Sequence, residues 1–327
     1  MKKTALITGI TGQDGSYLSE FLLKKNYKVH GVIRRVALED ATHRYWRLRN
    51  ILNKITIHAA SLESYASIIK IIQKVKPDEV YHLGAQSYID YAFKDEFSTV
   101  NTNINGTHHL LSALKDFSPK TKFYFAGSSE MFGKVIEIPQ KETTPFYPRS
   151  IYGITKCAGF DLTRNYREAY NLFGCTGILF NHESPRRGYE FVTRKISHAV
   201  ARIKLGLQKK LELGNMMAKR DWGHASDYVE AMWLMLQQKK PEDFVICTGK
   251  QYSVKDFAKL AFEQVNLDYR DYVVIKKHLQ RPSEVDSLLG DCSKAKKKLR
   301  WKPKVNFKGL VKDMVESDLE FVKDQGY

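Results

Sequence analysis

The chain of 327 residues (37.8 kDa) is about twice the ~150 residues of a typical domain, which excludes a peptide or a disulfide miniprotein. Its composition, 43% hydrophobic and 27% charged residues, excludes an intrinsically disordered chain. The net charge of +17 fits a nucleic-acid footprint, an affinity for anionic metabolites or a basic surface, and charge alone does not separate these.

Between residues 4 and 180, short β-rich apolar runs alternate with longer segments of helical period. The predicted strands are, in chain order, Ala5–Thr8, Val29–Arg34, Ile55–Ala59, Val80–Leu83, Phe123–Ala126 and Gly177–Phe180. Helices are predicted near 15–25, 63–74, 103–115 and 153–171, each long enough for a right-handed crossover. The alternation predicts an α/β fold with a doubly wound parallel sheet of the Rossmann type.

Beyond residue 181 the alternation ends. Helices are predicted at 193–206, 227–238, 254–264 and 308–322, with one more strand at Phe244–Cys247. We expect a Rossmann domain at 1–180, to which 222–249 return. A smaller C-terminal α/β lobe is expected from 181–221 and 250–327, with a ligand in the cleft between the two.

Targeting, metal-binding and nucleic-acid signals are weak. No stretch approaches the ~18 apolar residues of a membrane helix, and the start MKKTALITGITG predicts a strand rather than a signal peptide. The four cysteines stand far apart, with no C-x-x-C pair and no histidine cluster at metal-ligand spacing. The basic run 294–304 is interpreted as a solvated face. We therefore expect a cytoplasmic protein without metal, membrane or nucleic-acid partners.

The first predicted strand leads directly into three glycines at a spacing of three, Gly9, Gly12 and Gly15, and an apolar helix follows. In such a loop the first glycine permits a tight turn, the second lets the backbone approach a pyrophosphate, and the third lets helix and strand pack closely. The context of strand, loop and helix predicts dinucleotide binding. At the end of the second strand stand Arg34 and Arg35, which suit a ribose 2′-phosphate and predict NADP rather than NAD.

Tyr152 and Lys156 lie one helical turn apart, at the start of the helix that follows the fifth strand. A phenol can act as a base near neutral pH if a cation stabilises the phenolate. A second pair at this spacing, Tyr272 and Lys276, lies far from the glycine loop and is interpreted as structural. At the end of the fifth strand, Glu130 adds a carboxylate that can remove a proton next to a ketone.

Long segments in fixed order make the chain resemble the GDP-mannose 4,6-dehydratase family of the extended short-chain dehydrogenases. They include TGITGQDGSYLSEFLL (8–23), HGVIRR (30–35), HLGAQSY (82–88), GSSEMFGKV (127–135), EIPQKETTPFYPRS (137–150), ILFNHESPRRG (178–188) and FVTRKI (191–196), with further matches over 213–238 and 281–304. The chain departs from that family at residues 36–40, where a serine-rich loop is usual, and at Ser61, where an aspartate is usual.

The resemblance implies a role for each matching position. The implied catalytic residues are Ser128, Glu130, Tyr152 and Lys156. The implied cofactor-binding residues are Gly9, Thr11, Gly12, Gln13, Asp14, Gly15, Arg34, Arg35, Ser61, Leu62, Leu83, Ala85, Ser87, Tyr152, Lys156, His182 and Arg187. The implied substrate-binding residues are Ser87, Ser128, Glu130, Asn181, Val192, Lys195, Arg220, Arg281 and Glu284.

As a whole, the resemblance implies an NADP-dependent lyase that converts GDP-mannose to GDP-4-keto-6-deoxy-mannose, with residues 1–180 as the NADP-binding domain. It also implies a homodimer or homotetramer. Three alternatives stay open: an NADPH-dependent GDP-4-keto-6-deoxy-mannose reductase, a dehydratase of another GDP-sugar such as GDP-manno-heptose, and a catalytically silent NADP-binding or nucleic-acid-binding protein.

Overall fold

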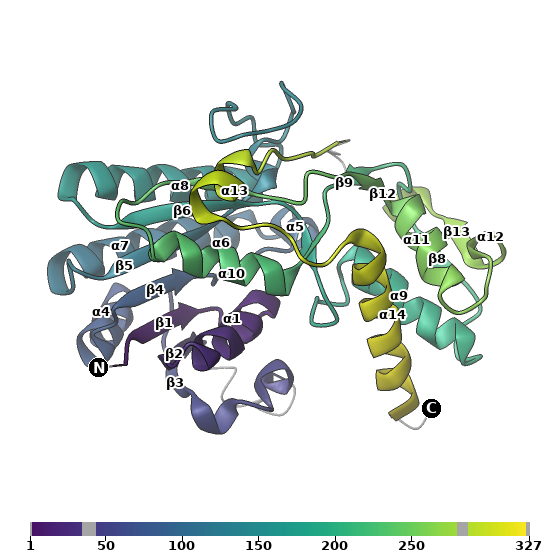
Figure 1. Cartoon of the computed structure of the whole chain (residues 1–327), viewed down its shortest axis with the longest axis horizontal. Helices are drawn as coiled ribbons and strands as arrows, with labels where there is room; N and C mark the ends of the chain where they lie inside the picture. The colour runs from purple at the N-terminus through teal and green to yellow at the C-terminus, as the bar shows by residue number, and fades with distance from the viewer. Residues whose placement is uncertain (1, 35–43, 280–286, 325–327) are drawn as a thin grey trace.

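The fold is built on a seven-stranded parallel sheet (Figure 1), in a computed structural model that describes residues 2–34, 44–279 and 287–324. Its strands are β1 (Thr4–Thr8), β2 (Lys28–Ile33), β3 (Thr56–Ala59), β4 (Glu79–His82), β5 (Lys122–Ser128), β6 (Gly174–Leu179) and β11 (Phe244–Ile246). They lie in the order β11-β6-β5-β4-β1-β2-β3. The chain thus starts in the middle and runs first to one edge, then to the other, which confirms the predicted doubly wound arrangement.

Helices cover both faces of this sheet. The first face packs against α4 (Tyr65–Val75), α7 (Gly106–Phe117) and α8 (Ile151–Tyr170), and the second against α1 (Gln13–Lys24) and α10 (Ala225–Leu236). The side chains of β5 alternate between the two faces and are apolar on both. Phe123 and Phe125 enter the core beneath α4 and α7, whereas Tyr124 and Ala126 enter the core beneath α1 and α10. Apolar residues on both faces of a strand are typical of a parallel sheet buried on both sides.

The segment before α7 differs from the sequence expectation. Two short helices, α5 (Ile89–Ala92) and α6 (Glu96–Val100), precede a π-helical stretch at Asn101–Asn105, which continues directly into α7. The predicted helix at 103–115 therefore begins earlier and contains a widened turn. Such π-helical turns are rare and frequently lie at functional sites.

A second core lies beside the sheet, to its right in Figure 1, and is formed mainly by helices. These are α9 (Val192–Lys204), α11 (Val254–Glu263), α12 (Tyr269–Tyr272) and α14 (Phe307–Asp324). On α9, Ile196, Ala199, Val200 and Ile203 recur at helical spacing and are buried in this core. Two-stranded pairs complete this region: β8 (Leu211–Leu213) with β13 (Val273–Ile275), and β9 (Lys219–Arg220) with β12 (Tyr252–Ser253).

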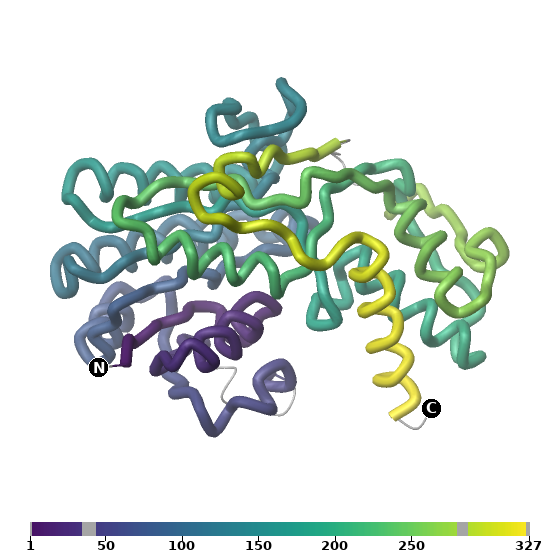
Figure 2. Tube along the Cα trace, in the orientation of Figure 1, coloured from purple at the N-terminus to yellow at the C-terminus, as the bar shows by residue number. Residues whose placement is uncertain are grey.

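The chain passes repeatedly between the two cores, as Figure 2 shows. After the second core has begun with α9, the chain returns to the sheet in α10 and β11. It returns again in α13 (Ser293–Leu299), which packs on β11 and α10, before it ends in α14. The division into two lobes stays a prediction. That prediction assigns all of residues 250–327 to the smaller lobe, and it does not include the return of α13 to the sheet.

Candidate functional site

The loop between β1 and α1 makes the tight turn that the glycine spacing predicts. Gly9 has a φ of +72°, and its carbonyl accepts a hydrogen bond from the Gly12 N–H at 3.0 Å. A Cβ on Gly15 would lie 2.4 Å from the Gly9 carbonyl oxygen, so α1 approaches the turn too closely for a side chain there. A Cβ on Gly12 would meet only that oxygen, at 3.2 Å. The outer side of the loop is therefore open for a phosphate at the start of α1.

Two side chains at the start of α1 fasten this loop to the segment after β6. The Gln13 amide donates to the His182 carbonyl at 3.0 Å and accepts from the Ser184 hydroxyl at 2.8 Å. Asp14 Oδ2 lies 2.8 Å from His182 Nε2. Burial alone would raise the pKa of Asp14, but the charge and hydrogen bond of His182 hold it below its ordinary value. Burial alone would lower the pKa of His182, but Asp14 raises it. An ion pair therefore stands beside the phosphate loop.

Tyr152 and Lys156 lie on the first turns of α8. The helix begins after Ser150, whose hydroxyl accepts a hydrogen bond from the Gly153 N–H at 3.0 Å. Lys156 Nζ donates to the carbonyl of Ala126 on β5 at 2.8 Å and lies 5.6 Å from the centre of the Tyr152 ring. Burial raises the pKa of Tyr152 to about 12 and lowers that of Lys156 to about 8. Burial thus favours the neutral form of both groups, and a bound cation beside the phenol would favour the phenolate.

Ser128 and Glu130 approach the phenol from the end of β5. The Ser128 hydroxyl lies near enough to the Tyr152 phenol to oppose the effect of burial on the pKa of that phenol, and it accepts a hydrogen bond from the Glu130 N–H at 3.2 Å. The negative charge of Glu130 is near enough to raise the pKa of Tyr152. The structure therefore brings a hydroxyl, a carboxylate, a phenol and an ammonium group together at the carboxyl edge of the sheet. This is the edge where ligands bind in doubly wound folds.

The loop after β4 carries Leu83, Ala85 and Ser87, and it lies next to the phosphate loop. A side chain that the sequence did not single out, Asn103 of the π-helical stretch, connects this loop to α8. Its amide group pairs with both backbone groups of Gln86 at 2.8 and 3.0 Å and donates to Thr155 Oγ1 at 3.0 Å. Thr155 in turn donates to the Tyr152 carbonyl at 2.8 Å. The periodicity of the sequence gives no sign of this role for Asn103, because its hydrogen-bond partners lie on separate segments of the chain.

The other predicted cofactor residues lie at the ends of neighbouring strands. Arg34 follows β2 and is exposed, and Ser61 follows β3. The side chain of Leu62 fills the space beside Gly84 and Gly106, where added Cβ atoms would lie 3.1 and 2.9 Å from it. Thr11 lies in the phosphate loop. Arg35 lies outside the described residues.

Four of the predicted substrate residues lie on the segments from the end of β6 to β9. Asn181 follows β6, and its side-chain oxygen is buried with no hydrogen-bond partner among the described residues. Such an oxygen is available to a donor from a ligand. Val192 and Lys195 lie on the first turn of α9, and Arg220 is buried in β9. The predictions for Arg281 and Glu284 fall outside the described residues.

Arg47 is a second side chain that the sequence did not single out. Its Nε donates to the Arg186 carbonyl at 2.7 Å, and its Nη1 donates to the Thr11 carbonyl at 3.3 Å. It therefore provides a second connection between the phosphate loop and the segment after β6. It belongs to no recognisable motif, and only the fold places it there.

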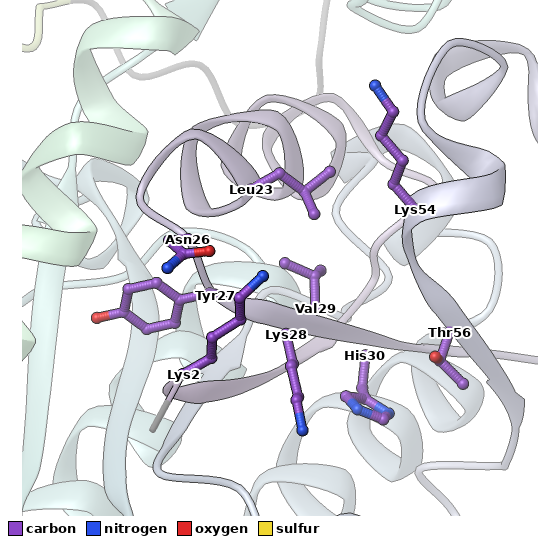
Figure 3. A pocket seen from close by; sticks show the side chains of 9 residues that line it. All are labelled: Lys2, Leu23, Asn26, Tyr27, Lys28, Val29, His30, Lys54 and Thr56. Carbon is purple, nitrogen blue, oxygen red and sulfur yellow. The ribbon is translucent and has the colours of Figure 1, made fainter.

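A separate hollow of about 400 Å³ lies at the opposite, amino-terminal ends of β1, β2 and β3 (Figure 3). Its basic residues do not converge: Figure 3 shows the Lys28 and Lys54 side chains pointing in opposite directions. This hollow contains none of the predicted site residues.

Within residues 2–34, 44–279 and 287–324, no helix is long and apolar enough to cross a bilayer. In the same ranges no three histidine, cysteine, aspartate or glutamate side chains gather as a metal site.

Comparison with known proteins gives a consistent result along the whole chain. The family profile described as "GDP-mannose 4,6 dehydratase" matches residues 6–314. The chain is 52% identical over 341 residues to GDP-mannose 4,6 dehydratase 1 of Arabidopsis thaliana, covering 100% of this chain and 94% of that protein. It is 49% identical over 345 residues to the GDP-mannose 4,6 dehydratase of Homo sapiens, covering 98% and 93%.

Among solved structures, the chain is similar to the UDP-glucose 4-epimerase of Thermotoga maritima crystallised with UDP-glucose. The TM-score is 0.86 at 26% identity, and the match covers 98% of this chain and 99% of that one. Both the sheet and the second core are therefore shared with a solved protein.

Proposed function

This chain belongs to the GDP-mannose 4,6-dehydratase family, and we propose that it converts GDP-mannose to GDP-4-keto-6-deoxy-mannose with loss of water. The observation that carries the proposal is the placement of Glu130 beside the group formed by Ser128, Tyr152 and Lys156. A phenol with a neighbouring lysine serves to oxidise an alcohol. A second proton-transfer group, a carboxylate, serves the elimination that follows.

The first half of the reaction oxidises the sugar at C4. Tyr152 takes the proton of the 4-hydroxyl, and Ser128 shares a hydrogen bond with the same oxygen. The Lys156 ammonium stabilises the phenolate, which burial alone disfavours. A nicotinamide dinucleotide, held by the loop between β1 and α1, would supply the reversible hydride transfer that oxidises C4 and later reduces C6.

The second half removes water across C5 and C6. Once C4 is a ketone, the C5 hydrogen is acidic, and the Glu130 carboxylate can take it. The hydroxyl on C6 then leaves as water with the proton that Glu130 took from C5, and a C5=C6 double bond forms. When a hydride adds to C6, C5 takes a proton from solvent. Because Glu130 lies on the turn directly after β5, it can approach the sugar from the strand that also carries Ser128.

The residues of the phosphate loop fit a dinucleotide, and we infer that it is NADP. The open side of Gly12 and the N–H groups at the start of α1 suit the pyrophosphate. Arg34, exposed at the end of β2, and Arg35 supply guanidinium groups for a 2′-phosphate. No carboxylate stands at 34 or 35 to bind a free 2′-hydroxyl instead.

The GDP part of the substrate is assigned to the region between β6 and the second core. Lys195 and Arg220 supply positive charge for the diphosphate, and Val192 begins α9, whose N-terminus favours negative charge. Asn181 offers a buried oxygen without a partner among the described residues. Arg281 and Glu284 complete the proposed set.

Self-association is proposed on the basis of an exposed apolar strip along α5, α6 and α8. Phe97 is 89% exposed, and Tyr91, Val100 and Ile154 beside it are exposed as well. Exposed apolar clusters of this kind typically mark interaction surfaces. We assign this strip to a second copy of the chain, in a homodimer or homotetramer.

The proposed reaction is tested by proton NMR of the purified protein with GDP-mannose in D₂O and a catalytic amount of NADP⁺. We expect a 4-keto-6-deoxy product with deuterium at C5 and no net formation of NADPH. Unchanged GDP-mannose would refute the proposal. In that event, stoichiometric use of NADPH with a GDP-4-keto-6-deoxy sugar would identify a reductase, and turnover of GDP-manno-heptose would identify a dehydratase of a different sugar.

A further inference from the structure

Glu183 is a buried carboxylate beside the candidate site that the sequence did not single out. It lies on β7 (His182–Glu183), which pairs in parallel with β10 (Gly223–His224), and it is 2% exposed. Its neighbours His182 and Ser184 both contact the start of α1. Because side chains alternate along an extended segment, Glu183 points the other way, toward the start of α9.

Two side chains from different parts of the site meet the same oxygen of Glu183. The Thr193 hydroxyl donates to Oε2 at 2.5 Å, and Arg187 Nε forms an ion pair with Oε2 at 3.1 Å. Thr193 lies on the first turn of α9, between the proposed substrate residues Val192 and Lys195. Arg187 is a proposed cofactor residue. One carboxylate thus touches the side chains that border both ligands.

Arg187 is held on a second side as well. Its guanidinium carbon lies 3.5 Å from the centre of the Phe191 ring, one residue before α9. Its positive charge reaches Asp14 of the phosphate loop, and it opposes the rise that burial causes in the pKa of the Tyr152 phenol. With one edge on Glu183 and one face on Phe191, the guanidinium has a fixed position close to the reacting groups.

We propose that Glu183 is a positioning residue that sets Arg187 for the dinucleotide and the first turn of α9 for the nucleotide sugar. This inference rests on the proposed function and adds a residue to it. The negative charge of Glu183 is needed on the side of Arg187, where it holds a cation in place. On the threonine side a neutral acceptor is sufficient, because the hydroxyl needs only a lone pair.

Because the contact with Arg187 needs a charge and the contact with Thr193 does not, two substitutions can remove these contacts separately. In Glu183→Gln the side-chain oxygen can still accept from Thr193, but the charge opposite Arg187 is lost. We expect the Kd for NADPH to rise by about two- to a hundredfold, the range of coupling energies between two side chains in contact, because the ion pair with Arg187 is lost. Thr193→Val removes only the other contact, so we expect a higher KM for GDP-mannose and an unchanged Kd for NADPH.

The measurements are NADPH binding by calorimetry, GDP binding by calorimetry, and turnover of GDP-mannose, each with the thermal midpoint as a check on folding. In Glu183→Gln combined with Arg187→Ala, the loss of NADPH affinity should equal that of Arg187→Ala alone, because the two act as a unit. A Glu183→Gln protein that folds and binds NADPH like the wild type would overturn the inference. So would a Thr193→Val protein that loses NADPH and GDP affinity together.

The outcome is distinguishable from a failure of the proposed function. If the wild-type protein does not turn over GDP-mannose, the proposed reaction fails, but the NADPH and GDP binding data still report on Glu183. If the wild-type protein turns over GDP-mannose and the variants bind both ligands unchanged, only the inference about Glu183 fails.

Discussion

The imidazole of His182 and the carboxylate of Asp14 lie 2.8 Å apart, and they join the segment after β6 to the first turn of α1. The contact sits beside the phosphate loop, where a bare carboxylate would repel a pyrophosphate. A protonated His182 neutralises that charge. The two pKa shifts agree with this, because the pKa of Asp14 is lowered and that of His182 is raised, each by the other against the effect of burial.

The first prediction concerns the pH dependence of dinucleotide binding. The stability that His182 contributes is complete below its unfolded-state pKa of ~6.5 and is lost as the pH rises through its raised folded-state pKa. Above that pH, Asp14 stays ionised, since its pKa is lowered, but it has lost the positive charge of His182. We therefore expect the Kd for NADPH to increase on the alkaline side, measured by fluorescence titration.

Two variants separate this effect from other titrations. His182→Gln can still donate to Asp14 but carries no charge, so its binding should be weak already at low pH and should not depend on this ionisation. Asp14→Asn removes the repelling charge, so its binding should stay tight as the pH rises. An alkaline loss of the same size in Asp14→Asn and in the wild type would assign the effect to another group.

The second prediction concerns Glu130. Glu130→Gln keeps the shape of the side chain and removes the base. We expect loss of dehydration by a factor of about 10²–10⁴, the usual range for a general base, and no deuterium incorporation at C5. Oxidation at C4 should persist, because Ser128, Tyr152 and Lys156 are unchanged, and absorbance of the reduced nicotinamide would reveal it in a single turnover. Normal product formation by this variant would remove Glu130 from the mechanism.

The sequence was sufficient to predict the strands of the sheet, because each strand is an apolar run that is bounded by turn residues and lies between helical segments. All seven predicted strands of the sheet are present with ends shifted by a few residues, and the interpretation of Tyr272 and Lys276 as structural agrees with their contacts. Tyr272 stacks on Phe262 in the second core, and Lys276 pairs with Glu212 at 3.5 Å.

Features that depend on tertiary contacts were missed. β7 and β10 have two residues each, too few for any periodicity, and they pair only because the chain returns after the second core has begun. The π-helical turn at Asn103 gives no compositional signal. The helix α13 was not predicted, because its sequence is mostly a run of lysines. Only Ala295 and Leu299 of this helix are buried, and most of its lysines face solvent.

The third prediction concerns self-association. Phe97→Asp places a charge in the middle of the exposed apolar strip on α6, and burying it in an interface would be costly. We expect the molar mass measured by light scattering to fall to that of a smaller species without loss of thermal stability. Phe321→Asp on α14 is the matched control, since Phe321 is also exposed but lies in another region. A wild-type monomer, or an unchanged mass for Phe97→Asp, would place no partner on this strip.

The last prediction uses two glycines of the phosphate loop that differ in what surrounds them. In Gly15→Ala the new Cβ would lie 2.4 Å from the Gly9 carbonyl oxygen and 2.5 Å from Ile10 Cα, so backbone must move. The expected cost is about 1–3 kcal/mol of stability, as for other overpacked sites. It is measured as a lower thermal midpoint in the absence of ligand.

In Gly12→Ala the Cβ meets only one atom, at 3.2 Å, and points to the open side of the loop. This variant should therefore melt close to the wild type but lose NADPH affinity, because the methyl group occupies the space through which a pyrophosphate approaches the backbone. If both variants lost stability equally, or if Gly12→Ala bound NADPH normally, the open side of the loop would not be the phosphate site.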